Sequence, residues 1–380
     1  MVKIVGLEAF PIEIPWKHPF KIATALYTTQ PYVIVKLYTD SDLVGYGEAV
    51  PCYEFTGETI GTVMSILKER IFPSIGGEDA FNIEAITGKM DEATVGNASA
   101  KGAIDMAIYD ILGKTLNQPV YNLLGGRVRD KALYLGGASI TTVEETVEEC
   151  VKDVLKGIRE LKIKVGEDPV RDAEKIRKVR EAVGSDAQIR VDANQGWLTP
   201  HRAIKAIKLM EKCDLQLVEQ PILAWNLKGL SHIRRTVDVP IMLDESVHTS
   251  KDAAKAIDAE ACDIINIKLM KSGGIFEALK INAVAESSGI ECFMGGMGET
   301  SIGQAAALHL LASRSNIKYG DVELPADEWG LKEDVAGGLK LTKVDGVLYM
   351  QVPSGPGLGV QFNDEAMRRY LVTNPLNVRR

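Results

Sequence analysis

The feature that most constrains this chain is a regular alternation of short apolar segments and amphipathic helical segments that begins near residue 132. The apolar segments recur about every 26 residues, which is the length of one strand–helix unit. They are centred near residues 135, 163, 191, 217, 243, 267, 293 and 321. Eight such units predict an α/β protein with a (β/α)₈, TIM-like barrel. The alternative, an open doubly wound sheet, would need a GxGxxG or GxxxxGK[ST] loop after an early strand, and neither motif stands there.

The regions on either side of this repeat differ from it. Residues 1–128 begin with strand-like segments at Val2–Ile14 and Tyr32–Thr39 and continue with helical patterns, which predicts a separate α+β unit. The segment after residue 325 is too short for another domain, so we expect it to return to the first unit. The predicted division is a capping domain at 1–128, a barrel at 129–325, and a C-terminal segment at 326–380 that joins the capping domain.

Composition excludes several classes of function. The chain has 380 residues and a formal net charge of −8, which argues against nucleic acid as the main partner. No apolar run reaches the roughly 18 residues that a membrane helix needs, and the N-terminus lacks the features of a signal peptide. The five cysteines are scattered without a CxxC pair, which argues against a disulfide scaffold or zinc knuckle. We expect a cytoplasmic protein with a small-molecule substrate and no nucleic acid or membrane partner.

Three carboxylates stand at the C-terminal ends of consecutive predicted strands: Asp192, Glu219 and Asp244. Barrel enzymes build their active sites at that end. Each residue alone could be an ordinary cap or loop carboxylate. Their equivalent positions on three neighbouring strands instead favour a shared metal, and oxygen ligands without His or Cys select Mg²⁺, with Mn²⁺ possible. Asn194 and Glu245 could orient these ligands from outside.

Lysines lie on both sides of the three carboxylates. Lys162 and Lys164 precede them by one strand, and Lys268 follows by one strand. The second and sixth strands of an eight-strand ring lie opposite each other, so Lys164 and Lys268 can face a substrate from two sides. A lysine base needs a pKa below its ordinary value, and the neighbouring Lys162 charge and the metal would both lower it. We interpret Lys271 as a surface residue at a helix start.

These motifs together resemble the muconate-lactonising subgroup of the enolase superfamily. They are K-x-K at 162–164, D-x-N at 192–194, E-Q-P at 219–221, D-E-S at 244–246 and I-K-x-x-K-x-G-G at 267–274. The resemblance also covers GYGEAVP in the first unit and VPSGPGLGV near the end. It implies Asp192, Glu219 and Asp244 as Mg²⁺ ligands, and Lys164 and Lys268 as an acid/base pair that acts through an enolate. It also implies a homo-oligomer.

Within that subgroup the chain looks most like the dipeptide epimerases, such as L-Ala-D/L-Glu epimerase. Those carry D-x-D on the last barrel strand to bind the α-ammonium group of the dipeptide, and here Asp321 and Glu323 occupy these positions. The alternative for both residues is an ion pair at the strand end. Lys162 and the small Gly296 would also adjoin the substrate, and Tyr27 would contact it from a capping loop.

The resulting hypothesis is a magnesium-dependent epimerase or racemase. It would abstract the α-proton of a dipeptide or an N-substituted amino acid with two lysines. The alternative on the same site is a lyase: a cycloisomerase, an o-succinylbenzoate synthase-like enzyme or a dehydratase. A third class, a binding protein without catalysis, would leave the five chemical positions without a purpose.

Overall fold

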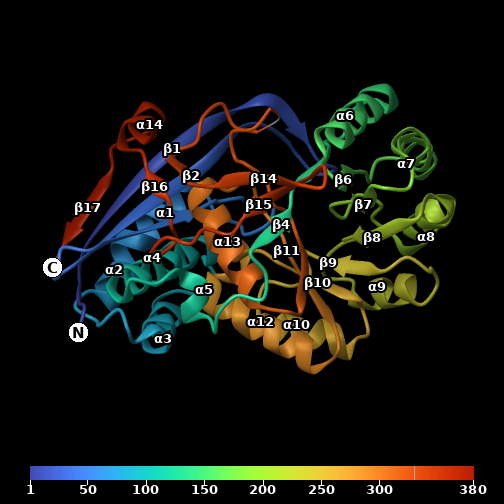
Figure 1. Cartoon of the computed structure of the whole chain (residues 1–380). Helices are drawn as coiled ribbons and strands as arrows, with labels where there is room; N and C mark the ends of the chain where they lie inside the picture. Colours follow the sequence, from blue (N-terminus) through green and yellow to red (C-terminus); the bar gives the residue numbers. More distant parts are fainter. Residues whose placement is uncertain (329) are drawn as a thin grey trace.

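The computed structural model describes residues 1–328 and 330–380. Eight parallel strands form one sheet in the order β12-β11-β10-β9-β8-β7-β6-β5, so neighbours in sequence are neighbours in the sheet (Figure 1). At its ends, the Leu135 N–H donates to the Val322 carbonyl at 2.8 Å, which joins the first strand to the segment after the last. The predicted barrel is confirmed. Its strands are β5 (Leu135–Ala138), β6 (Glu160–Lys164), β7 (Gln188–Asp192), β8 (Leu215–Glu219), β9 (Ile241–Leu243), β10 (Ile264–Ile267), β11 (Glu291–Met294) and β12 (Ile317–Gly320).

Helices follow these strands, and their starts are encoded locally. In α6, Thr142 and Glu145 form a reciprocal capping box, and Gly157 ends the helix in the left-handed conformation. In α7, the N-cap residue Asp168 stands before a proline at the first helical position, and its side chain accepts from the two backbone N–H groups that follow the proline. The helices are α6 (Val143–Lys156), α7 (Pro169–Val183), α8 (Pro200–Met210) with η2 (Glu211–Cys213), α9 (Leu227–Arg234), α10 (Ser250–Asp258), α11 (Leu269–Ser272), α12 (Ile275–Ser287) and α13 (Ser301–Ser313).

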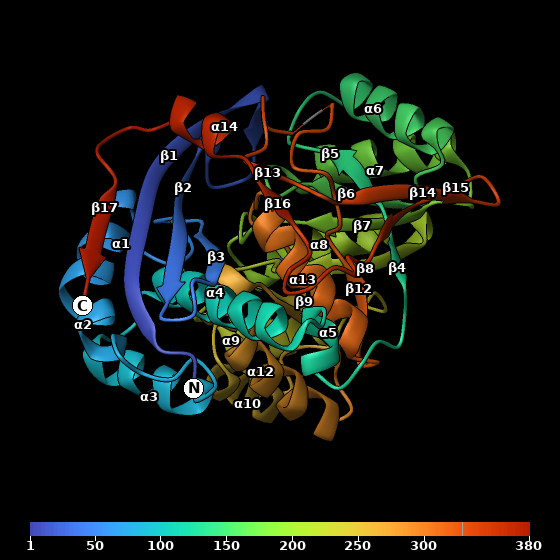
Figure 2. The same ribbon diagram turned by 60° about the vertical axis from the view of Figure 1, so that its left-hand side comes forward.

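The capping domain is built from both ends of the chain, as predicted. Its antiparallel sheet has the order β17-β1-β2-β3, so the C-terminal strand pairs with the first strand (Figure 2). The strands are β1 (Ile4–Lys21), β2 (Leu26–Thr39), β3 (Val44–Ala49) and β17 (Leu376–Arg379). The helices are α1 (Ile60–Ile66), η1 (Leu67–Ile71), α2 (Phe72–Ile75), α3 (Ile83–Ala93), α4 (Ala98–Leu116) and α5 (Val120–Leu123).

Helix α4 lies between the capping sheet and the barrel. It packs on β3 so closely that a Cβ at Gly45 would come within 2.1 Å of the Ala107 carbonyl oxygen, and one at Gly47 within 1.9 Å of the Ala103 carbonyl oxygen. The two glycines of the GYGEAVP segment, which lie within strand β3, are therefore required by helix–sheet contact. Residues Ser99–Gly113 are all buried, and so α4 belongs to the interior of the protein.

The remaining elements connect the two parts. β4 (Lys131–Leu133) pairs with β15 rather than with the barrel, at the start of the region predicted as barrel. One hydrophobic core runs from Phe10 and Ile12 of β1 into the barrel. Among the described residues, no helix is long and apolar enough to cross a membrane. These elements are β13 (Ala336–Gly337), β14 (Lys340–Val344), β15 (Val347–Gln351), β16 (Gln361–Phe362) and α14 (Asp364–Arg369).

Candidate active site

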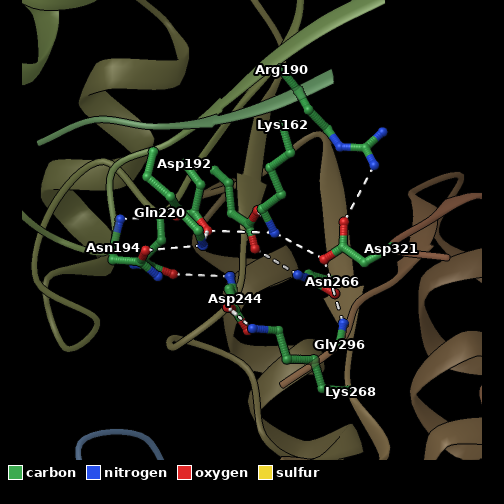
Figure 3. A network of polar contacts seen from close by, with 12 residues as sticks. Lys162, Arg190, Asp192, Asn194, Gln220, Asp244, Asn266, Lys268, Gly296 and Asp321 are labelled. Carbon is green, nitrogen blue, oxygen red and sulfur yellow. Dashed lines mark hydrogen bonds and ion pairs between the residues drawn. The ribbon is translucent and has the colours of Figure 1, made fainter. Parts of the chain in front are cut away.

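Strand register brings the predicted site residues to one level of the barrel. Lys164 on β6 is the register partner of Asp192 on β7, and Asp192 is the partner of Glu219 on β8. Glu219 pairs in turn with Met242 of β9, and Asp244 follows two residues later. Because parallel strands end at the same rim, these side chains lie at the C-terminal mouth of the barrel. Figure 3 shows two of them, Asp192 and Asp244, in one polar network with Lys162 and Lys268.

A cavity of about 710 Å³ opens at this mouth. Its floor includes Lys162, Lys164, Asn194 and Lys268 from the barrel. The capping domain supplies other parts of the lining, including Phe20, Tyr27, Cys52 and Phe55. The Phe55 ring centroid lies 4.9 Å from the Lys268 Nζ, and the Phe20 ring centroid lies 6.0 Å from the Lys164 Nζ. Each of the two predicted bases is thus covered by one aromatic ring from the capping domain.

The lysines contact the carboxylates directly. Lys164 Nζ donates to Asp192 Oδ2 at 2.5 Å, and Lys268 Nζ lies 2.6 Å from Asp244 Oδ2. Lys271 Nζ lies 2.8 Å from Asp244 Oδ1 and donates to the Asp244 carbonyl oxygen at 2.5 Å. The interpretation of Lys271 as a surface residue was wrong, because it is 1% exposed. The short helix α11 turns its side chain inward toward Asp244 instead of outward to solvent.

Lys162 is the centre of a buried ion network. Its Nζ lies 2.8 Å from Glu219 Oε2, 2.9 Å from Asp321 Oδ2 and 3.5 Å from Asp192 Oδ2. Burial lowers the pKa of Lys162, but these three carboxylates outweigh it and raise the pKa well above its ordinary value. Asp321 Oδ1 also faces Arg190 Nη2 at 3.3 Å. Both oxygens of Asp321 therefore have cationic partners inside the barrel, as in the ion-pair alternative.

The three central carboxylates differ in their electrostatics. Burial raises the pKa of Asp244, but Lys268 and Lys271 outweigh it and hold that pKa far below its usual range. Lys164 and Lys162 similarly keep the pKa of Asp192 low against the effect of burial. For Glu219, burial and the Asp192 charge raise the pKa to about 7. Glu219 is therefore the weakest acid of the three.

Acidic neighbours dominate the pKa of Lys268. Burial lowers that pKa, but the nearby Asp244 and Glu219 carboxylates raise it above the ordinary lysine value. The sequence expectation of a lowered lysine pKa includes the charge of a bound metal ion, so it stays a prediction. A bound cation shared by these acids would offset their charge.

The carboxylate oxygens of Asp192, Glu219 and Asp244 fit a hard divalent cation, although the distances between these side chains are not those of a metal site. Glu219 Oε2 and both Asp244 carboxylate oxygens are buried and accept no hydrogen bond, although ammonium groups lie within 2.8 Å. Within residues 1–328 and 330–380, no three His, Cys, Asp or Glu side chains already stand at metal-ligating spacing. Each acid is turned toward a lysine instead. Binding Mg²⁺ would therefore require the ammonium groups to give way to the ion.

Polar neighbours hold the carboxylates in place. Asn266 Nδ2 donates to Glu219 Oε1 at 2.6 Å, and Gln220 Oε1 accepts from the Asp244 N–H at 3.0 Å. Asn194 accepts from Lys164 Nζ at 3.2 Å and donates to Glu245 Oε1 at 3.3 Å. Asn194 and Glu245 therefore lie where the sequence analysis places them, next to the site and outside its centre.

The other predicted substrate contacts also line the cavity. Glu323 and Gly296 do so from the segments after β12 and β11, and Tyr27 from β2. The Gly296 N–H points to Asp321 Oδ2 at 3.4 Å, and the Tyr27 hydroxyl lies 3.6 Å from Cys52 Sγ. Burial and the Asp327 and Asp321 carboxylates raise the pKa of Glu323 to about 8.

Sequence reasoning missed a second polar layer below the site. Arg190 precedes Asp192 by two residues, and Asn266 precedes Lys268 by two residues. Side chains two apart on a strand point to the same face. This period-two spacing was the signal that could have identified both. Gln220, which follows Glu219 with a φ of 34°, carried no such signal, because its role depends on a left-handed backbone turn.

Known proteins resemble the whole chain. The family model "Mandelate racemase / muconate lactonizing enzyme, N-terminal domain" matches residues 7–125, and "Enolase C-terminal domain-like" matches residues 145–366. The N-succinyl-L-Arg/Lys racemase of Bacillus cereus is 38% identical over 376 residues, which cover 98% of each chain. The L-Ala-D/L-Glu epimerase of Clostridium acetobutylicum is 41% identical over 352 residues, with 92% of this chain and 96% of the relative covered.

A solved structure agrees with these relatives. The dipeptide epimerase of Enterococcus faecalis, complexed with Mg and the dipeptide L-Leu-L-Tyr, superposes with a TM-score of 0.88 at 37% identity, with 94% of this chain and 99% of that chain covered. Family models, sequence relatives and fold all point to one group. The chain therefore belongs to the mandelate racemase / muconate lactonizing enzyme family of the enolase superfamily.

Proposed function

We propose that this enzyme is a magnesium-dependent epimerase or racemase that removes and returns the α-proton of a dipeptide or an N-substituted amino acid. One observation carries the proposal: Lys164 at the end of β6 and Lys268 just after β10 line one cavity. In the eight-strand order three strands separate β6 from β10 on either side, so the two strands lie opposite each other. A substrate between them has one amine on each face of its α-carbon.

The two lysines have complementary roles in proton transfer. One lysine takes the α-proton from the first face, and the other delivers a proton to the opposite face, which inverts the carbon. Lys162, held charged by its three carboxylates, adds a fixed positive charge beside the reacting group. Phe20 and Phe55 each place an apolar ring near one of the two lysines, which reduces the contact of that lysine with water.

Asp192, Glu219 and Asp244 are the residues that would hold the metal. Mg²⁺, or Mn²⁺ in its place, would supply Lewis-acid stabilisation of negative charge on the substrate oxygens. The buried oxygens of Glu219 and Asp244, which accept no hydrogen bond and have ammonium groups as their close neighbours, support this assignment. The E. faecalis relative, which is complexed with Mg and a dipeptide, supports it further.

A deuterium screen tests the function. The enzyme is incubated in D₂O with Mg²⁺ and a library of dipeptides and N-succinyl amino acids, and products are analysed by mass spectrometry and chiral chromatography. We expect a mass increase of one deuterium together with inversion at one α-carbon. Loss of mass, as in dehydration, or a ring-opened or ring-closed product would identify a lyase and reject the proposal.

The two substrate classes can be separated at Glu323. A dipeptide presents an α-ammonium group near the end of the last strand, whereas an N-acylated amino acid presents a neutral amide. Burial raises the pKa of Glu323 to about 8, and a bound ammonium group would favour its charged form. Glu323→Gln cannot take that form, so we expect about a tenfold increase in KM for dipeptides and no change for N-succinyl substrates. Glu328→Gln is the matched control, because Glu328 lines the same cavity but is paired with Lys156 at 2.6 Å.

A further inference from the structure

Helix α4 of the capping domain lies directly against the segment that carries Lys268. A Cβ at Gly102 would lie 3.2 Å from the Leu269 carbonyl oxygen and 3.3 Å from the Gly274 nitrogen. The segment 268–275 thus meets the helix backbone to backbone. Figure 2 shows α4 between the capping sheet and the barrel helices. Any displacement of α4 would be transmitted to this segment through contacts with no flexible side chain between them.

Asp105 of α4 fixes the far end of the segment. It is 2% exposed, and its Oδ1 and Oδ2 accept from the N–H groups of Ile275 at 2.5 Å and Phe276 at 3.2 Å. These are the first two residues of α12, whose N-cap is Gly274, a residue without a side chain to cap the helix. A Cβ at Gly274 would come within 2.4 Å of Asp105. Asp105 therefore caps α12 from another domain.

The backbone between Lys268 and the residues that Asp105 binds is held by its own hydrogen bonds. The Lys268 carbonyl accepts from the Ser272 N–H at 3.0 Å, and the Leu269 carbonyl accepts from the Gly273 N–H at 3.1 Å and the Gly274 N–H at 3.0 Å. These bonds close 268–274 into one compact turn. The turn is held at one end by β10 and at the other by Asp105, so the position of Lys268 depends on both.

The Lys164 side has a counterpart that comes from the barrel. Asp172 of α7 is 3% exposed and accepts from the Gly166 N–H at 3.0 Å and the Trp197 Nε1–H at 2.9 Å. Gly166 lies two residues after Lys164. After each predicted base, backbone N–H groups of the following segment thus donate to the carboxylate of a buried aspartate. The two aspartates differ in which domain supplies them.

We propose that Asp105 is a positioning residue for Lys268: it acts through the turn 268–275 and makes the capping-domain helix α4 part of the proton-transfer apparatus. This inference rests on the two-lysine function proposed above. A displaced reacting group can cost about 100-fold in rate for a shift near 1 Å. Loss of the Asp105 clamp should therefore slow the step at Lys268 more than the step at Lys164.

Direction-resolved exchange tests this inference. The probes are the two epimers of the substrate that the wild-type enzyme exchanges fastest in the deuterium screen. Initial rates of α-proton exchange in D₂O are measured separately from each epimer, with Lys164→Ala and Lys268→Ala identifying which lysine deprotonates which epimer. We expect Asp105→Asn to slow the Lys268-directed exchange about tenfold more than the Lys164-directed exchange. Asp172→Asn should show the opposite bias.

Asp110→Asn is the matched control. Asp110 is a buried acid on the same helix that accepts from the Tyr46 and Leu358 N–H groups at 2.9 Å, away from the Lys268 turn. It should change both exchange rates by the same factor. If Asp105→Asn does so too, Asp105 is only structural and the inference is rejected. Asp105→Glu, which keeps the charge and shifts the clamp, gives the same test if the Asn variant does not fold.

The outcomes separate this inference from the function on which it rests. If Lys164→Ala and Lys268→Ala each retain exchange from one epimer and the Asp105 variants show no bias, only the role of Asp105 is rejected. If either lysine variant exchanges both epimers at the wild-type rate, the two-lysine function is wrong, and the role of Asp105 is overturned with it.

Discussion

The two flanks of the site hold the same side chain by different means. Lys164 sits within a regular strand, where the register with Asp192 on β7 fixes its place. Lys268 lies just past the end of β10, at the N-cap of the single-turn helix α11. Its side chain is 4% exposed, compared with 12% for Lys164. The Lys164 flank is therefore a product of the barrel, and the Lys268 flank is a product of the barrel and the capping domain together.

This difference indicates which of the two lysines is more sensitive to changes elsewhere in the protein. A strand residue keeps its position as long as the sheet forms, because the neighbouring strands fix its register. A residue on a short turn depends on whatever packs against that turn, which here is α4, and on the contact that Lys271 of the turn makes with Asp244. We expect changes in the capping domain to alter the Lys268 flank first. The predictions below test this asymmetry.

Removing either base should abolish inversion. We expect Lys164→Ala and Lys268→Ala to lower epimerisation by about 10³-fold or more, since each removes a positioned acid/base group. Each variant should still exchange the α-proton of the epimer that faces the remaining lysine. Chiral chromatography and deuterium incorporation measure the two effects. Equal loss of exchange from both epimers in one variant would show that the flanks do not act independently.

Replacing Lys271 should mainly lower the stability of the folded protein. The loss should be larger without Mg²⁺ than with it. Lys271→Met leaves the buried Asp244 with one cation in place of two, and breaking a buried ion pair costs about 3 kcal/mol. Added Mg²⁺ should restore more of the Tm in this variant than in the wild type, because the ion replaces the missing charge. Calorimetry with and without Mg²⁺ measures this. Lys164→Met, on the more exposed flank, is the control, and its free energy of unfolding should decrease less.

The sequence predicted the barrel because its strand–helix units repeat at a regular spacing, and the same spacing led to the proposed central residues. Strand–helix spacing located all eight strands, and Asp192, Glu219 and Asp244 stand at equivalent points of that spacing. The return of the C-terminal segment to the capping domain was also predicted. β17 could not be registered on β1 from the sequence alone, since its four residues carry little pattern.

The environment of the site was harder to predict, because it depends on contacts between distant segments. Lys271 looked like a surface residue, since α11 is too short to show which face it buries. Asp105 gave no signal at all, because its partners at Ile275 and Phe276 lie about 170 residues away and are backbone groups. The raised pKa of Lys268 likewise depends on how closely the Asp244 and Glu219 carboxylates pack against it.

The two aromatic rings should contribute unequally. The Phe55 ring lies 4.9 Å from the Lys268 Nζ, whereas the Phe20 ring lies 6.0 Å from the Lys164 Nζ. Cation–π attraction is worth about 1–2 kcal/mol at close, desolvated contacts and fades near 6 Å. We expect Phe55→Ala to lower kcat/KM about tenfold, and Phe20→Ala about threefold. Tyr53→Ala, at a neighbouring residue that is 71% exposed, is the control. A larger loss at Phe20 would reverse the proposed asymmetry.

The pH dependence of stability should distinguish the two buried aspartates, Asp105 and Asp172. Burial raises the pKa of Asp105 from its ordinary value of 3.8 to about 7, against the two N–H groups of α12, which lower it. Between about pH 4 and pH 7 the unfolded chain has released this proton and the folded chain retains it. The contribution of Asp105 to the free energy of unfolding therefore falls as pH rises through this window.

Asp105→Asn removes that titration, so the free energy of unfolding of the wild type relative to the variant should decrease from pH 4.5 to pH 7 in chemical denaturation. Burial also raises the pKa of Asp172, but the Trp197 and Gly166 N–H groups and the Lys175 ammonium favour its charged form. The same comparison with Asp172→Asn should therefore show a shallower slope. Equal slopes would mean that the two clamps are buried alike and that the flanks differ only in the domain that supplies them.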